Sequence, residues 1–444
     1  MTGGTMHGSG PSEGGNWQTT SATRRLFQQG ANLVRRRFAM LLVTVGMVLF
    51  PLAPLSMGQT ESGSFHPRRG ATVATLPSSQ RVEAGVSADL LSIYQATKSA
   101  RTPEEVTEII DRCRDIHRAS DRSAVDREYA QQLLAWGLNR RGELRSTMAN
   151  QLALDGQYGE AREWDTKARQ DFAEAVELEP ENWRSRHNLA IALAIDGDFS
   201  SALEHISRAL ELNPNYANAY FNRAEFYFEL GRFDDAASDY QRALELNPED
   251  AQAFNGRAHC RFLLDDLEHA LEDYQQAVRL APTDAAMRLD LADMYQYLGK
   301  WEAAAEQYRE AVKRNPQDAR AYHHAAWLMA TCPDAGIRNP QLAVASARKA
   351  IELAAEPSAE LLETLAVALA ATGDLQHSVV TAREALRRCD DEQLSQDLRR
   401  RIADWEHRLR RPPPSSSETT SGPPTALGQR PSMRTSESSR RTRK

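Results

Sequence analysis

The stretch ANAYFNRAEFYFELGRFDDAASDYQRALELNPED, residues 217–250, decides the fold of this chain. Its first half places Tyr220, Ala224 and Tyr227 at the spacing of one helix face, and Gly231 then interrupts the pattern. A second apolar stripe with helical spacing follows, so the stretch predicts two helices joined by a glycine turn. One such hairpin cannot bury the apolar faces of both helices, whereas stacked copies can.

The unit recurs along the chain at a fixed interval. Five prolines stand 34 residues apart, and each closes a segment of the type A-L-E-L-x-P: Pro180, Pro214, Pro248, Pro282 and Pro316. Proline cannot continue a helix and disfavours helical geometry in the residue before it, so each marks a helix end. The regular interval therefore predicts a solenoid of helix hairpins.

This pattern resembles the tetratricopeptide repeat. In the units that begin at residues 183, 217, 251 and 285, alanine occupies positions 8, 20 and 27, as that family expects. Position 24, where the family has an aromatic residue, holds Ile206 in the first unit and tyrosine in the next three. The resemblance is strong over 183–318 and implies an all-α, right-handed superhelix of stacked hairpins. It further implies a non-catalytic protein that binds a protein or peptide on its concave face.

The repeats at 183–391 become irregular towards their carboxyl end. The unit at 319–358 has five extra residues around CPDAGIRNP, which predicts a longer turn between its helices. The following unit carries Ser378 where the family has alanine. Residues 392–411 place apolar groups on one stripe of a polar segment, as expected of a capping helix.

The region before the repeats, 87–182, predicts longer helical pairs. A second helix reaching Pro180 is seven residues longer than the standard one, and its partner over about 124–154 is correspondingly long. Gly137 and Gly142 are possible breaks in that partner helix. A further helical pair is predicted over 87–99 and 103–119, with Thr102-Pro103 as a start signal.

Two arginines break the apolar pattern at position 7. They are Arg223 and Arg257, and the same two units have Asp239 and Asp273 at position 23. Both positions lie eight residues from the turn centre, so an antiparallel hairpin brings them level. We therefore predict an Arg223–Asp239 and an Arg257–Asp273 ion pair. The alternative is that both arginines extend along a solvated edge.

The resemblance implies that positions 2, 5, 6, 9, 12 and 13 of each first helix line the concave face. Asparagine amides there can hydrogen-bond a peptide backbone, and aromatic rings can anchor apolar side chains. The alternative for each residue is a solvated groove wall. The predicted partner-binding residues are Arg184, His187, Asn188, Asn218, Phe221, Asn222, Glu225, Asn255, His259, Asp290, Asp293, Tyr297, His323 and Trp327, together with Phe228, Phe262 and His324.

The family's clamp for a carboxyl-terminal carboxylate is absent from this sequence. That clamp has lysine at position 5, where the four units here hold His187, Phe221, Asn255 and Leu289. A ligand held by its terminal carboxylate is therefore not supported.

No motif of an enzyme occurs in the sequence: it lacks G-x-S-x-G, H-E-x-x-H, a phosphate-binding P-loop and a complete G-x-G-x-x-G. The adjacent His323 and His324 point to different sides of a helix and do not readily share a metal. Asp265-Asp266 replaces the usual turn glycine and predicts a turn rather than a catalytic pair. We predict no catalysis, no cofactor, no metal and no small-molecule substrate.

Charge and cysteine content exclude further classes. The 444 residues carry 54 Lys and Arg against 61 Asp and Glu, a net charge of −7, so no basic face for nucleic acid is indicated. The four cysteines lie far apart, which argues against a zinc site or a disulfide scaffold. Cys260 and Cys332 fall on helical stripes and are predicted to be core residues.

The amino-terminal region predicts export. A leader at 1–37 ends in three arginines, and an apolar segment at 38–58 follows, as in a secretory signal. Residues 56–58, Ser-Met-Gly, form an acceptable cleavage site. The alternative is a single retained transmembrane helix, since about 20 apolar residues can span a bilayer. Both place the rest of the chain outside the cytoplasm, in the periplasm or extracellular space. Residues 59–86 predict a flexible linker and 412–444 a disordered basic tail.

Three functions remain open at this level. The first is an exported adaptor that binds a protein or peptide in its concave groove. The second is a membrane-anchored, self-associating scaffold of an envelope complex. The third is a regulatory subunit of an enzyme whose catalytic chain is separate.

Overall fold

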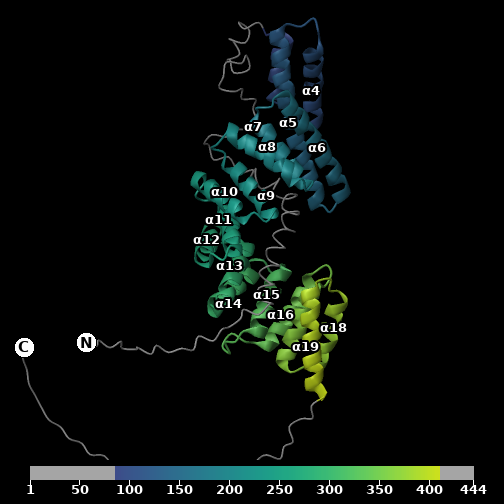
Figure 1. Cartoon of the computed structure of the whole chain (residues 1–444). Coiled ribbons are helices and arrows are strands. Elements are labelled where there is room, and N and C mark those ends of the chain that lie inside the picture. The colour runs from purple at the N-terminus through teal and green to yellow at the C-terminus, as the bar shows by residue number, and fades with distance from the viewer. Residues whose placement is uncertain (1–85, 411–444) are drawn as a thin grey trace, which may run out of the picture.

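The computed structural model describes residues 86–410, which form an elongated stack of helices without any strand among them (Figure 1). The predictions for the leader, the apolar segment, most of the linker and the tail lie outside these residues. The helices are α3 (Ala88–Thr97), α4 (Pro103–Arg118), α5 (Ala124–Leu154), α6 (Tyr158–Leu178), α7 (Trp183–Ile195), α8 (Phe199–Leu212), α9 (Ala217–Glu229), α10 (Phe233–Leu246), α11 (Ala251–Leu263), α12 (Leu267–Leu280), α13 (Ala285–Tyr297), α14 (Trp301–Arg314), α15 (Ala319–Thr331), α16 (Pro340–Leu353), α17 (Ala359–Thr372), α18 (Leu375–Arg387) and α19 (Glu392–Arg410).

The central hairpins follow the 34-residue interval. In the unit at 251–284, the Asp250 side chain accepts hydrogen bonds from the backbone N–H groups of Gln252 and Ala253, each at 3.0 Å, and so caps the first turn of α11. Helix α10 ends at Leu246, directly before Asn247 and Pro248. A capped start and a proline stop therefore fix the helix lengths from local sequence alone.

The turn inside each hairpin needs one residue with positive φ. Gly231 supplies it between α9 and α10 with φ 74°, at no steric cost. In the next unit Asp265 adopts φ 64° at the equivalent position, and within residues 86–410 it is the one non-glycine residue with positive φ. The predicted Asp265–Asp266 turn is thus present, but it holds a side chain in a strained conformation.

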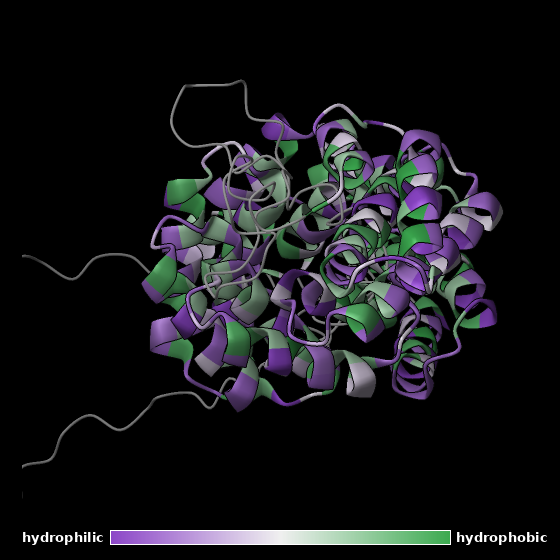
Figure 2. Cartoon of the chain, turned by 90° about the horizontal axis from the view of Figure 1, so that it is seen from above, coloured by the Kyte–Doolittle hydropathy of each residue, from purple (hydrophilic) through white to green (hydrophobic). Residues whose placement is uncertain are grey.

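Alanine and tyrosine fill the space between helices. The alanines at positions 8, 20 and 27 of the unit at 217–250, Ala224, Ala236 and Ala243, are at most 1% exposed. Tyr240 packs where α11 approaches most closely, because a Cβ added at Gly256 would lie 2.7 Å from its hydroxyl oxygen. Viewed along the stack, single helices carry both hydrophobic and hydrophilic residues (Figure 2). The core is therefore a continuous series of small clusters between neighbours.

The first hairpins are longer, as the sequence predicts. Helix α6 has 21 residues against 14 in α8, a difference of seven. Helix α5 runs unbroken for 31 residues, so the expectation of breaks at Gly137 and Gly142 is wrong. Both glycines instead permit close packing: a Cβ at Gly142 would lie 2.5 Å from Cε1 of Phe172, and one at Gly137 would lie 2.9 Å from Cγ1 of Ile110.

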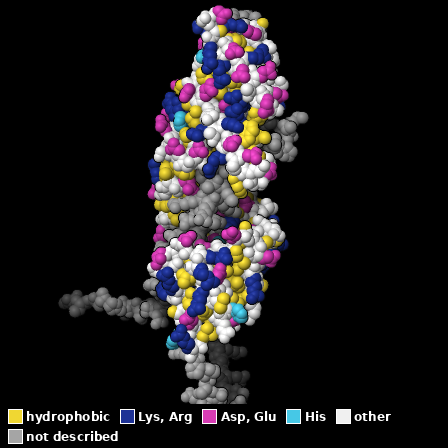
Figure 3. Space-filling view, turned by 90° about the vertical axis from the view of Figure 1, so that its right-hand side faces the viewer, with side chains coloured by type: hydrophobic (Ala, Val, Ile, Leu, Met, Phe, Trp, Pro, Cys, Tyr) yellow, Lys and Arg dark blue, Asp and Glu magenta, His cyan; other side chains and the backbone are white. Residues whose placement is uncertain are grey.

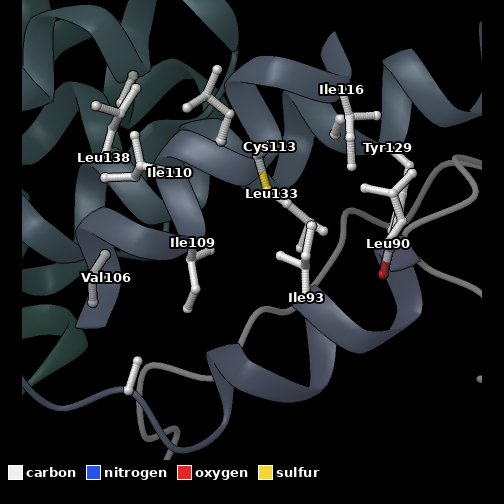
Figure 4. Close-up of a cluster of buried hydrophobic side chains, with 14 of the residues drawn as sticks. Leu90, Ile93, Val106, Ile109, Ile110, Cys113, Ile116, Tyr129, Leu133 and Leu138 are labelled. Atoms are coloured by element: carbon white, nitrogen blue, oxygen red, sulfur yellow. The ribbon is translucent and has the colours of Figure 1, made fainter. Parts of the chain in front are cut away.

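A separate apolar cluster closes the amino-terminal end of the stack. Helices α3, α4 and α5 contribute aliphatic side chains and the ring of Tyr129, all buried from water (Figure 4). The side chain of Thr102 and that of Glu105 each accept a hydrogen bond from the other's backbone N–H, which fixes the start of α4. This cluster packs α3 and α4 against the first half of α5.

The carboxyl-terminal end is closed by α19. Its Leu394, Leu398 and Trp405 are at most 5% exposed and join the apolar cluster of α15 to α18. Eight residues, 332–339, connect α15 to α16, compared with three between α9 and α10. Among helices α3 to α19, none is long and apolar enough to cross a membrane.

Candidate functional site

The first helices of neighbouring units touch one another along the stack. Contacts join α7 with α9, α9 with α11, and α13 with α15. This places the first helices on the inner side of the superhelix and the second helices outside. We call the inner face of α7, α9, α11, α13 and α15 the groove.

The predicted partner-binding residues divide into two groups by exposure. The first group keeps surface in the groove: Arg184 is exposed, and the half-buried members are Asn188, Asn218, Phe221, Asn255, Phe262, Asp290, Asp293, Tyr297 and His324. The second group is at most 9% exposed: His187, Asn222, Glu225, Phe228, His259, His323 and Trp327. The expectation that these seven present their side chains to a partner is therefore corrected, because the chain itself covers them.

Polar residues join neighbouring first helices through hydrogen bonds. The Asn222 amide donates to Nε2 of His187 at 3.0 Å, from α9 to α7. Asn255 on α11 donates to Asp290 on α13, also at 3.0 Å. Each bond links position 5 of one unit to position 6 of the next. The groove floor is thus held by hydrogen bonds between units as well as by apolar packing.

A second regular contact runs between the two helices of a unit. The hydroxyl of Tyr308 donates to the Asp293 carboxylate at 2.5 Å, and the hydroxyl of Tyr240 donates to Glu225. In both units the tyrosine stands at position 24 and the acid at position 9. Burial raises the pKa of Glu225 to about 7, an effect to which the charges of Glu229 and Asp250 add.

Burial keeps two histidines, His187 and His323, neutral. Burial lowers the pKa of His187 to about 4 and that of His323 to about 3. Neutral His187 accepts the hydrogen bond from Asn222 through Nε2. The next residue, His324, contacts Asp293 on α13, with its Nδ1 2.8 Å from the carboxylate. These histidines therefore serve the packing between helices.

Trp327 does not lie in the groove. It belongs to the apolar cluster that α19 closes, and the guanidinium of Arg401 lies over its ring at 5.8 Å from the centroid. The repeat pattern did not predict the burial of Trp327, because α19 lies after the last repeat. An apolar stripe on residues 392–411 was the one available signal that this helix covers an earlier unit.

The two arginines of position 7 form two-point ion pairs inside their hairpins. Arg223 donates to both oxygens of Asp239 at 2.6 and 2.8 Å, and Arg257 does the same to Asp273 at 2.8 and 2.6 Å. Each arginine also reaches the second helix of the preceding unit, where Arg223 donates to Ser207 at 3.2 Å and Arg257 donates to Gln241. The sequence pattern did not suggest these additional partners.

The described part of the chain holds no cluster of side chains suited to binding a metal ion. Within residues 86–410 no group of three or more His, Cys, Asp or Glu residues is placed to hold a metal ion. Cys113, Cys260 and Cys332 are buried and all four cysteines are free thiols. Burial raises the pKa of Cys113 to about 12, so that thiol does not ionise near neutrality.

Positive and negative side chains alternate over the surface. The face drawn in Figure 3 carries Lys and Arg interspersed with Asp and Glu. Many of these form exposed pairs one helical turn apart, such as Arg242 with Glu245 and Lys349 with Glu352. On this face, charges of both signs lie close together and offset each other.

Comparison with known families agrees with this architecture. The tetratricopeptide repeat model matches residues 217–250 and 251–284, a second model of this repeat matches 192–231, and a third matches 289–329. The chain is therefore a tetratricopeptide repeat protein. No curated protein sequence matches it.

Several solved structures are similar in fold. A tetratricopeptide repeat protein from Parabacteroides merdae is 20% identical, with a TM-score of 0.43, over 59% of this chain and 98% of its own. Yeast Tom70 is 17% identical, with a TM-score of 0.40, over 89% of this chain and 76% of its own. A protein from Thermus thermophilus is 24% identical, with a TM-score of 0.35, over 43% of this chain and 100% of its own.

Proposed function

We propose that this chain is a non-catalytic adaptor that binds a peptide segment of a partner protein in the groove. The observation that carries this proposal is the row of half-buried amide and aromatic side chains along consecutive first helices. Asn218 offers an amide and Asn255 an unpaired amide oxygen for a peptide backbone, and Phe221 and Tyr297 offer rings for apolar side chains. The amide nitrogen of Asn188 already donates to Asn139 and Glu143. Proteins of this repeat family generally bind protein or peptide partners, which supports the same reading.

A rigid groove suits this role. The hydrogen bonds from Asn222 to His187 and from Asn255 to Asp290 fix the spacing of adjacent first helices before any ligand arrives. A preformed site loses little conformational entropy on binding, so more of the contact energy appears as affinity. Recognition here is docking of an extended or helical segment without covalent chemistry.

We further propose that the adaptor works outside the cytoplasm. This rests on the arginine cluster followed by the apolar segment 38–58, both of which lie outside the described residues. A second role for the same groove is a membrane-anchored scaffold that binds other copies of the chain. An uncleaved segment 38–58 in the mature protein would favour that scaffold.

Site-specific photocrosslinking in native envelope fractions tests the adaptor. A benzophenone side chain replaces Asn218 or Tyr297 in the groove of the full-length chain. Control positions are Glu272 and Arg279, which are exposed on α12 and lie outside the groove. Crosslinked products are identified by mass spectrometry.

The groove positions are expected to capture a second protein in defined stoichiometry, and the α12 positions are not. Links only between copies of this chain would favour the scaffold. Equal capture at groove and control positions would overturn docking in the groove. Substrate turnover by the purified chain alone would overturn the non-catalytic assignment.

A further inference from the structure

Acidic side chains gather on the floor of the groove in its middle units. Glu225 lies on α9, while Asp290 and Asp293 lie on α13. The carboxylates of Asp290 and Asp293 keep 14% and 12% of their side-chain surface exposed, so a ligand can reach them. A histidine lies beside each of these two acids: Nδ1 of His324 is 2.8 Å from Asp293, and Nε2 of His259 is 3.9 Å from Asp290.

One buried hydroxyl between these acids has no partner. Tyr274 is 0% exposed, and its hydroxyl makes no hydrogen bond in the structure. The tyrosines one unit before and one unit after, Tyr240 and Tyr308, both donate to an acid at position 9. In the unit of Tyr274, position 9 holds His259, whose ring meets Tyr274 edge-on at 5.2 Å.

His259 does not take the place of the missing acid, since the Tyr274 hydroxyl makes no hydrogen bond to it. Its Nδ1 lies 2.8 Å from the backbone carbonyl of Asn255 and is engaged there. Burial, and then the charges of Asp290 and Asp293, raise the pKa of Tyr274, so its phenol lies within the field of that acidic pair. The unpaired hydroxyl therefore sits at the acidic part of the floor.

A second polar atom beside this acidic pair is unpaired. Oδ1 of Asn255 is buried and makes no hydrogen bond in the structure. Asn255 uses its amide nitrogen for Asp290, which leaves its carbonyl oxygen as an acceptor. Buried polar atoms are nearly always paired in folded proteins, and exceptions point to a missing water, ion or ligand. Two such atoms beside two carboxylates indicate a site that a ligand completes.

We propose that this part of the groove, formed by Asn255, Tyr274, Asp290 and Asp293, binds the cationic side chain of an arginine or lysine in the partner peptide. The site is rich in acceptors: an amide oxygen, a phenol oxygen and two carboxylates. A guanidinium offers five N–H donors in a plane and an ammonium offers three, so either can pair with several of these atoms together. An anionic group is disfavoured there by Asp290 and Asp293. This inference rests on the proposed function, because it names the chemistry of the segment that the groove would hold.

Peptide libraries with blocked termini test the proposal on the full-length chain. The decapeptides are acetylated and amidated, and the central residue is fixed as arginine, lysine, citrulline or glutamate while the other positions vary. Binding is measured by fluorescence anisotropy on the natural sequence and on Asp290→Asn/Asp293→Asn. The control is Glu268→Gln/Glu272→Gln, which removes the same charge from α12, and circular dichroism melting verifies that each variant folds.

Arginine and lysine libraries are expected to bind at least about tenfold more tightly than citrulline and glutamate libraries, as charge-assisted hydrogen bonds require. That preference should disappear in Asp290→Asn/Asp293→Asn and persist in the α12 control. Binding without preference for a cation would overturn the inference and leave peptide docking standing. Failure of all libraries to bind would count against the proposed function itself. A synthetic peptide of residues 434–444 is included, and its retention alone would identify the chain's own tail as the occupant instead of a partner.

Discussion

Tyr308 and Asp293 stand fifteen residues apart on the two helices of one hairpin, and the tyrosine hydroxyl donates to the carboxylate at 2.5 Å. Tyr240 and Glu225 make the same contact two units earlier. The phenol comes from the position where the family has an aromatic core residue, so the hairpin core and the groove floor share one side chain. A change in the floor therefore also changes the packing between the helices.

Glu225 gives this contact a pH dependence. Its folded pKa of about 7 lies above the ordinary carboxyl value of 4.5, because burial disfavours the charged form. The folded chain thus holds a proton that the unfolded chain releases, and the associated stability is present below pH 4.5 and lost as pH rises through 7. We expect Glu225→Gln to stabilise the chain by roughly 3 kcal/mol at pH 8 and to have little effect near pH 4. Thermal melting at both pH values measures this, and an equal gain at the two would contradict it.

Asp273 binds two arginines. It accepts from Arg257 at two points and from Arg261 at 2.6 Å, and its side chain is 5% exposed. Asp273→Asn leaves two cations without a charged partner and should cost about 3 kcal/mol of unfolding free energy, measured by urea denaturation. The exposed pair of Arg232 and Asp235 serves as the control. Asp235→Asn should change stability by less than about 1 kcal/mol, and equal losses for both variants would argue against burial as the cause.

Gly142 lies where α5 meets the ring of Phe172. A methyl group added there would stand 2.5 Å from Cε1 of that ring, so Gly142→Ala should destabilise the chain by about 1–3 kcal/mol. Gly159 in the first turn of α6 has open space around it. Gly159→Ala should be neutral or stabilising by up to about 1 kcal/mol, since alanine favours helix. Calorimetry measures the melting temperature of both variants. An unchanged melting temperature for Gly142→Ala would contradict the prediction and would mean that the Phe172 ring can move to accommodate the methyl group.

Asp265 occupies the turn position that glycine occupies in the neighbouring hairpins. Its φ of 64° strains an aspartate, so Asp265→Gly should raise stability by about 1 kcal/mol. The reverse change at the equivalent turn, Gly231→Ala, should lower it by a similar amount because φ there is 74°. Chemical denaturation of both variants measures the difference. A loss of stability on Asp265→Gly would mean that the carboxylate contributes more than the backbone strain costs.

The sequence predicted the parts of the fold that local rules control. Proline stops, small residues at the helix contacts and the turn glycines sufficed for the hairpins, because each acts within one unit. The extra five residues before α16 and the extra seven in α6 could likewise be counted from the spacing. The glycines of α5 were misread as breaks because their role depends on Ile110 and Phe172, which belong to other helices.

The groove was less predictable. The repeat positions indicated which residues face inward, but not which of them the neighbouring unit covers. His187 and Asn222 became partners of each other, and Trp327 was covered by α19. Those outcomes depend on contacts between units, and a pattern that repeats within each unit carries no information about a helix beyond the last one.

Arg223 and Arg257 connect neighbouring units as well as the two helices of their own unit. Each guanidinium holds the two helices of its own unit and also a helix of the unit before it. These shared contacts join α8 to α12 across the boundaries between units. A force applied to both ends of the molecule would therefore have to break them, in addition to the apolar packing, before neighbouring units in this stretch could separate.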